Sequence, residues 1–384
     1  MRSYKIAIIV VVVLLGGAGL GFVITGFATA GVIEYDHNIT YDPSSPDSIE
    51  DLKINADIGK IIVQYNTSAT PHYADIDVNI KISGLFMAGK SYTNFFSPSS
   101  EWWAESTKTF TLTVLPEVWF DPSHWFSSYN INITVTLRTD IVYDLYVSSS
   151  TGSVGMYIPE NVELNRTYLV SSTGSVSMEA NNVTFDSHVG LDTSTGSVYM
   201  ETNEVIFNGQ VGMSSSTGSS SIFATETEFM KGYNIGTSTG SLTLNFTNCL
   251  MGDNIDGLVS TGSITYRSYN MVYTKNLNLN LETSTGGINA YIHQYNNMNA
   301  NVTSHLETST GSIGVLYRDS LANTGVRFLS STSTGSIDYT SDSTMEILGD
   351  LYQSLNYGTA TQKYNFSLTT STGNVAVDGE SAQV

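Results

Sequence analysis

The tripeptide Ser-Thr-Gly occurs ten times in this 384-residue chain. The first five intervals between its glycines are 22 residues each, the next three are 24, 25 and 24, and the last is 38. The amino-acid composition determines how often a tripeptide occurs, but not the spacing between its copies. The equal intervals therefore predict a repeat array whose small units stack on their neighbours. The glycines are Gly152, Gly174, Gly196, Gly218, Gly240, Gly262, Gly286, Gly311, Gly335 and Gly373.

Apolar residues recur at fixed distances from each glycine. They prevail five positions before it, as at Leu169, and two and four positions after it, as at Val176 and Met178. Val176 and Met178 are two positions apart, so their side chains lie on the same face of a strand. Leu169 is seven positions before Val176, and in one unbroken strand it would point to the opposite face. Glycine permits such a corner. We therefore expect an all-β fold, a parallel and right-handed β-solenoid of about 22-residue coils with the ten glycines at its corners.

The N-terminus carries an uncharged run from Ile6 to Ile33. It is long enough to cross a bilayer as a helix. Basic residues precede it and acidic residues follow it, which predicts a single-pass cell-membrane protein with its N-terminus inside and its C-terminal part extracellular. A cleaved signal sequence is the alternative, because Ala28-Thr29-Ala30 resembles a cleavage site. We predict four segments: an anchor or signal at 1–33, a linker at 34–50, a β-rich cap at 51–145 and the repeats at 146–384.

Charge and motif content exclude several classes of function. The net charge of −20 argues against a nucleic-acid partner, since phosphate binding needs clustered Lys and Arg. The single cysteine, Cys249, is interpreted as a small buried hydrophobe. Glu282 and Glu307 share a register position, but we interpret them as a solvated outward row. The histidines show no metal-binding spacing. We predict no catalytic residues, metal or cofactor, and no enzyme.

The repeated Ser-Thr-Gly-Ser-Val/Ile units, led in by Ile131–Val135 and Asp144–Val147, resemble the putative adhesin family of bacterial and archaeal surface proteins. The resemblance covers residues 145–380 well and 50–145 loosely. It implies a membrane-anchored or secreted β-solenoid with a role in cell adhesion. The usual Gly-Asp corner of that family is absent here, because Ser, Gly287 or Asn374 follows each glycine.

Two loops of the cap hold all four tryptophans of the chain. Binding energy is usually concentrated in aromatic or Arg anchors, and Arg is scarce here. We therefore predict a non-enzymatic, adhesin-like surface or scaffold protein that binds an unknown surface glycan or protein through these loops. A membrane-tethered envelope sensor acting through a partner protein is the second hypothesis, and a polysaccharide-active enzyme is the third. The predicted contact residues are Trp102, Trp103, Trp119 and Trp125.

Overall fold

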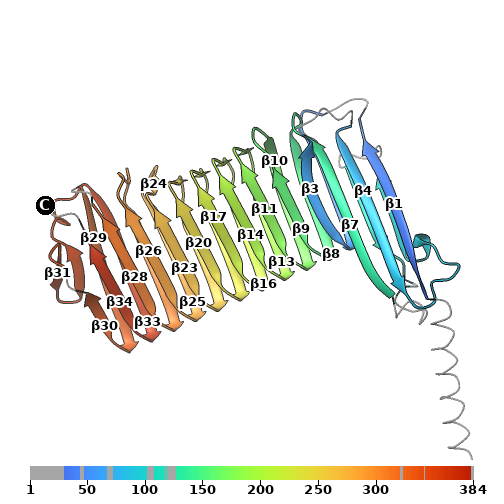
Figure 1. Cartoon of the computed structure of the whole chain (residues 1–384). Coiled ribbons are helices and arrows are strands. Elements are labelled where there is room, and N and C mark those ends of the chain that lie inside the picture. The colour runs from blue at the N-terminus through green and yellow to red at the C-terminus, as the bar shows by residue number, and fades with distance from the viewer. Residues whose placement is uncertain are drawn as a thin grey trace, which may run out of the picture.

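The computed structural model describes residues 30–43, 47–66, 72–101, 108–116, 118, 127–320, 323–340 and 342–381. These form two long β-sheets that face each other, with strands stacked along one axis (Figure 1). One short 3-10 helix, η1 (Tyr92–Asn94), lies at the N-terminal end. The fold of the described residues is therefore all-β.

The first sheet, sheet A, is open and mixed. In spatial order its strands are β1 (Gly31–Tyr41), β4 (Ala74–Gly84), β7 (Ser127–Arg138), β3 (Lys60–Asn66), β9 (Val154–Ile158), β11 (Val176–Asn181), β14 (Val198–Asn203), β17 (Ser220–Thr225), β20 (Leu242–Thr247), β23 (Ile264–Tyr269), β26 (Ile288–Gln294), β28 (Ile313–Asp319), β34 (Val375–Glu380) and β30 (Ile337–Thr340). The pairs β1–β4 and β4–β7 are antiparallel, and the pairs from β7 onward are parallel.

The opposite sheet, sheet B, is also mixed. Its strands pair in the order β5 (Phe96–Glu101), β6 (Lys108–Val114), β2 (Glu50–Ile58), β8 (Tyr143–Thr151), β10 (Glu163–Thr173), β13 (Val189–Thr195), β16 (Val211–Thr217), β19 (Tyr233–Thr239), β22 (Ile255–Thr261), β25 (Leu277–Thr285), β27 (Val302–Thr310), β33 (Gln362–Thr372), β29 (Thr324–Thr334), β32 (Leu351–Ser354) and β31 (Met345–Leu348). A parallel row of two-residue strands joins the sheets on one side: β12 (Thr184–Phe185), β15 (Ile206–Phe207), β18 (Glu228–Phe229), β21 (Leu250–Met251) and β24 (Val272–Tyr273).

Each Ser-Thr-Gly segment connects a strand of sheet B to the next strand of sheet A. All ten glycines have φ between 139° and 151°, a region closed to other residues without strain. The hydroxyl three positions before the glycine donates to the glycine carbonyl of the preceding unit, as from Thr193 to Gly174 at 2.8 Å and from Thr237 to Gly218 at 2.7 Å. This bond satisfies a carbonyl that the corner would otherwise leave without a partner, which explains the preference for Ser or Thr there.

A second corner follows each central strand of sheet A. Asn182, Glu204, Glu226, Asn248 and Asn270 all occupy it, eight positions after a corner glycine, with φ between 49° and 55°. Asn adopts this left-handed conformation more readily than most residues. Each central unit thus has three sides, formed by a strand of sheet A, a two-residue strand and a strand of sheet B.

The core lies between the two sheets. Outside the Gly335 unit, where Ile337 is exposed, the residues five positions before the glycine and two and four positions after it are buried, as are Leu169, Val176 and Met178. Aromatic rings stack along the axis, with 5.0 Å between the centroids of Phe185 and Phe207 and 5.2 Å between those of Phe207 and Phe229. Cys249 is also fully buried, and burial raises the pKa of its thiol to about 11.

The last two units do not stack in chain order. Strand β33 lies between β27 and β29, and β34 lies between β28 and β30. Gly373 therefore stacks on Gly311, and Gly335 stacks on Gly373. The segment between them forms the antiparallel pair β31–β32, which continues sheet B beyond β29. The 38-residue interval between Gly335 and Gly373 contains this antiparallel pair.

The predicted fold class needs correction. The predicted parallel β-solenoid is wrong, because antiparallel pairs at both ends make the sheets mixed. Strands β2, β3, β6 and β7 belong to the same two sheets as the repeats. Gly59, between β2 and β3, acts as a further corner glycine whose carbonyl accepts the Ser149 hydroxyl at 2.9 Å.

The predicted membrane anchor is corrected as well. In the part of the chain that the structure describes, no helix is long and apolar enough to span a membrane. Residues 1–29 lie outside that part, and Gly31–Ile33, the end of the predicted helix, belong to strand β1 paired with β4. The helix ending at Ile33 is therefore wrong. The predicted membrane contact and the single-pass location rested on that helix and are corrected with it.

Candidate functional site on the outer face of sheet A

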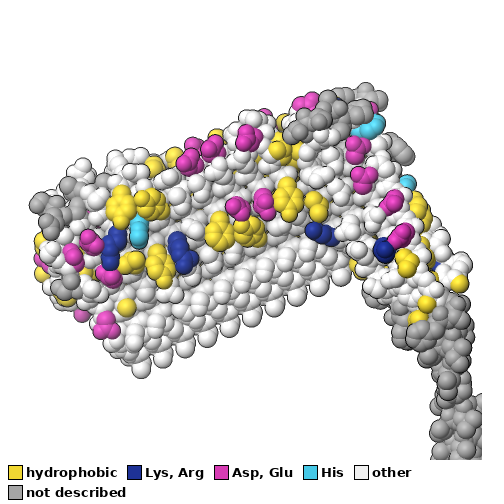
Figure 2. Space-filling view, in the orientation of Figure 1, with side chains coloured by type: hydrophobic (Ala, Val, Ile, Leu, Met, Phe, Trp, Pro, Cys, Tyr) yellow, Lys and Arg dark blue, Asp and Glu magenta, His cyan; other side chains and the backbone are white. Residues whose placement is uncertain are grey.

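Aromatic side chains lie on the outer face of sheet A, the face turned away from the core. Outward positions alternate with the buried ones along each strand. Figure 2 shows hydrophobic side chains in a broken row across this face, with Lys or Arg and Asp or Glu between them. We call the following residues the aromatic band: Tyr157, Tyr199, Phe223, Tyr269, Tyr291 and Tyr295.

The band is exposed although the sheet beneath it is closely packed. Tyr157 is 46% exposed and Tyr291 is 38% exposed, whereas the neighbouring inward residues Met156 and Ala290 are buried. Large apolar side chains that remain exposed in a group mark contact surfaces more often than isolated ones do. All of these rings except Tyr295, which directly follows β26, stand on paired strands of one sheet, so their backbone positions are fixed before any ligand arrives.

Contacts between neighbouring strands orient several rings of the band. The ring centroids of Tyr199 and Phe223 are 5.8 Å apart, and those of Tyr269 and Tyr295 are also 5.8 Å apart. The guanidinium of Arg267 lies over the ring of Tyr291, 5.1 Å from its centroid. Such contacts restrict the side chains and lower the entropy lost on binding.

Polar groups accompany the rings at one end of the band. The Tyr199 hydroxyl donates to the Glu201 carboxylate, and this bond raises the pKa of Tyr199 to about 12. The Asn203 amide donates to the Asn181 side-chain oxygen at 2.8 Å. An open groove of about 440 Å³ lies here, lined in part by Tyr157, Pro159, Glu179, Asn181, Glu201 and Asn203. It combines an aromatic wall with hydrogen-bonding groups, as small-molecule sites do.

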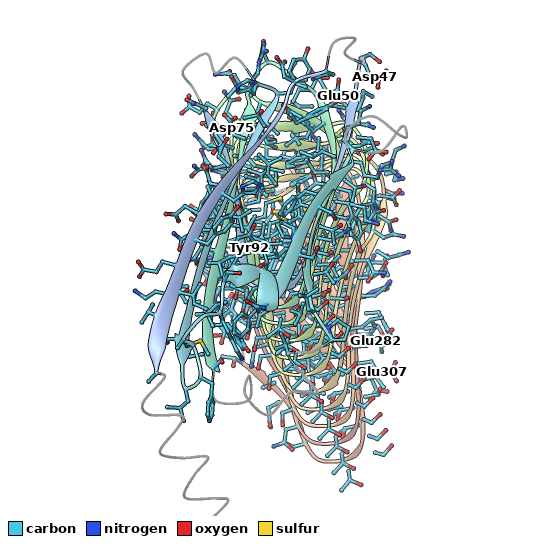
Figure 3. The ribbon with its side chains drawn as sticks, turned by 90° about the vertical axis from the view of Figure 1, so that its right-hand side faces the viewer. Asp47, Glu50, Asp75, Tyr92, Glu282 and Glu307 are labelled. Atoms are coloured by element: carbon cyan, nitrogen blue, oxygen red, sulfur yellow. The ribbon has the colours of Figure 1, made fainter. Side chains whose placement is uncertain are left out.

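A larger groove, of about 560 Å³, lies on the outer face of sheet B. It contains Glu282 and Glu307, which are opposed in register on β25 and β27 (Figure 3). Both are exposed, and Glu307 contacts His305 at 2.9 Å. Paired catalytic carboxylates are usually shielded from solvent so that their pKa values differ, and both of these side chains are open to solvent. No group of three or more His, Cys, Asp or Glu among the described residues could hold a metal ion. The groove on sheet B therefore has fewer features of a ligand site than the smaller groove on sheet A.

The residues predicted from sequence fall into two groups. The ten glycines occupy the corners between the sheets, where they shape the fold and leave the contact surface to other residues. The predicted contact residues Trp102, Trp103, Trp119 and Trp125 all lie outside the described residues. Sequence reasoning missed the aromatic band, although Tyr157, Phe223 and Tyr291 share the fifth position after a corner glycine.

Comparisons with known proteins add little to this picture. No protein-family model and no curated protein matches the chain. A solved structure described as "a putative cell adhesion protein" from Clostridium sporogenes ATCC 15579 is 10% identical, with a TM-score of 0.23 over 90% of this chain and 100% of that one. One described as "a putative adhesin" from Bacteroides fragilis NCTC 9343 is 12% identical, with a TM-score of 0.28 over 90% of this chain and 97% of that one. These TM-scores are too low for the likeness to establish a fold or a function.

Proposed function

We propose that this protein is a non-enzymatic, adhesin-like binding protein that uses the aromatic band as its contact surface. The observation that carries the proposal is the exposure of several rings on one rigid sheet face, with rings held by their neighbours. A few aromatic anchors commonly supply most of the energy of a contact. The absence of a catalytic cluster from the described residues agrees with binding, but it does not carry the proposal.

The rest of the described surface supports the same choice of contact face. The edge formed by the Ser-Thr-Gly segments carries small hydroxyl side chains, which are well hydrated and bury little apolar area. Sheet B also exposes large apolar side chains, among them Tyr146 on β8, Leu258 on β22, and Leu329 and Leu348 on β29 and β31, but Tyr146 is the one aromatic ring in this set. The aromatic band is the denser supply of rings on an outer sheet face.

Attachment under flow tests this proposal. Beads carrying the full-length chain should be retained on immobilised cell-envelope material. The triple substitution Tyr157→Ala, Phe223→Ala and Tyr291→Ala should lower retention at least about tenfold, because each lost ring removes a stacking contact. The matched control is Tyr146→Ala, Leu258→Ala and Leu329→Ala on sheet B, which should leave retention unchanged.

Unchanged retention of the triple variant would contradict the proposal. Retention that survives the triple substitution, in a protein with an unchanged melting temperature, would rule out the aromatic band as the contact surface. The sequence-based prediction leads to a different result, because it expects retention to fall when Trp102, Trp103, Trp119 and Trp125 are changed to Ala. The two sets of substitutions therefore decide between the two surfaces.

A further inference from the structure

We infer that the ligand of the aromatic band is an extended, neutral polysaccharide lying along the stacking axis of the repeats. This inference rests on the proposed function, because it names the ligand class of the same surface. The faces of pyranose rings carry C–H groups with partial positive charge, and these stack on the negative faces of aromatic rings. A row of exposed rings on a flat sheet suits a chain of such sugars.

The polar groups of the band suit sugar hydroxyls. Hydroxyls both donate and accept hydrogen bonds, so a sugar site needs acceptors such as carboxylates and two-way partners such as amides. Glu179, Glu201, Asn181 and Asn203 provide both kinds beside Tyr157, where the groove of about 440 Å³ lies. Arg267, between Phe223 and Tyr291 along the sheet, provides donors at the other end. A purely hydrocarbon ligand could not form hydrogen bonds with these groups.

Charge excludes an anionic polymer as the ligand. Stacking rings can also hold the bases of single-stranded nucleic acid, but that mode needs a positively charged groove along the backbone. This chain has a net charge of −20, and Glu179 and Glu201 lie in the band's own groove. Nucleic acids, acidic polysaccharides and anionic lipid surfaces would all be repelled.

The length of the band implies a polymer. Tyr157 on β9 and Tyr291 on β26 are separated by five intervening strands of sheet A. At ~4.8 Å between neighbouring strands, the two rings are about 29 Å apart along the axis. A sugar unit in an extended β-linked chain is comparable in length with one strand spacing, so about six units would span the distance. A single sugar could contact only one ring or one pair of neighbouring rings.

Titration with oligosaccharides of defined length tests the inference. The full-length chain is titrated calorimetrically with glucose and with β-1,4-linked gluco-, manno- and N-acetylglucosamine oligosaccharides of two to six units. At least one series should bind, with the six-unit member at least about tenfold tighter than the two-unit member as more rings are engaged. The triple substitution Tyr157→Ala, Phe223→Ala and Tyr291→Ala should lower the six-unit affinity at least about tenfold.

Two control variants show whether ring stacking is responsible. Tyr157→Phe with Tyr291→Phe keeps both rings and should retain binding. The sheet B variant Tyr146→Ala, Leu258→Ala and Leu329→Ala should also retain it. The inference is overturned if no series binds at millimolar concentration, if glucose binds as tightly as the six-unit chains, or if the triple substitution leaves affinity unchanged. Loss of bead attachment in the triple variant together with no oligosaccharide binding would refute the glycan ligand and leave the contact surface intact.

Discussion

Replacing Gly196 by valine should destabilise the fold by about 3 kcal/mol or more, because two costs act at one position. Gly196 has a φ of 142°, which a β-branched residue adopts only with strain. A Cβ placed there would also lie 2.1 Å from the carbonyl oxygen of Gly174 in the preceding unit. That atom belongs to the backbone of a paired strand connection and cannot move without separating the units.

Urea denaturation measures this effect, with Ser194→Ala as the matched control. Ser194 lies two positions earlier in the same corner and is exposed, so its replacement should change stability by less than about 0.5 kcal/mol. The corner assignment is refuted if the two variants unfold at the same urea concentration.

Cysteine cross-linking should show that the last two units exchange their order in space. Leu316 on β28 is opposite Asp378 on β34, and Asp378 is in turn opposite Thr340 on β30. Cysteine pairs at 316/378 and at 378/340 should each oxidise to a disulfide almost completely. The pair 316/340 is two strand spacings apart, about 10 Å, which is beyond the reach of a disulfide. Gel mobility after oxidation gives the result.

An order of stacking that followed the sequence would reverse the pattern. In that case the pair 316/340 would oxidise and the pair 316/378 would not. The native Cys249 does not confuse the test, because it is fully buried and its pKa is raised to about 11. It stays in place as an unreactive thiol.

The spacing of apolar residues around each glycine predicted those parts of the fold that are determined within a single unit. The apolar positions around Gly174 and Gly196 identify the strands, their buried faces and the corner between them. The second corner was missed because Glu204 and Glu226 occupy it in two units, and Glu does not signal a left-handed conformation as Asn182 does.

The arrangement of the ends depends on contacts that a repeat motif does not encode. The same Ser-Thr-Gly corner at Gly311, Gly335 and Gly373 can stack on any of the others, so the motif cannot specify that Gly373 is the middle one. The antiparallel pairing of β1 with β4 was likewise hidden, because β1 begins inside the apolar run that predicted an anchor.

The contact surface was harder to predict than the fold. Outward positions of sheet A hold Tyr157, Glu179, Glu201, Phe223 and Asn245 in successive units, so no consensus marks them. The tryptophans attracted attention because they are concentrated in sequence. The aromatic band is concentrated only in space, after strands far apart in the chain have paired.

Hydroxyl-radical footprinting of the full-length chain on its bound surface tests the contact assignment most directly. Side-chain oxidation is measured by mass spectrometry with and without the cell-envelope material that retains the protein-coated beads. We predict that Tyr157, Phe223 and Tyr291 become protected, while the comparably exposed Tyr146 on sheet B keeps its rate of oxidation. Protection of Trp102, Trp103, Trp119 and Trp125, or of Tyr146, with no change at the aromatic band would contradict the account.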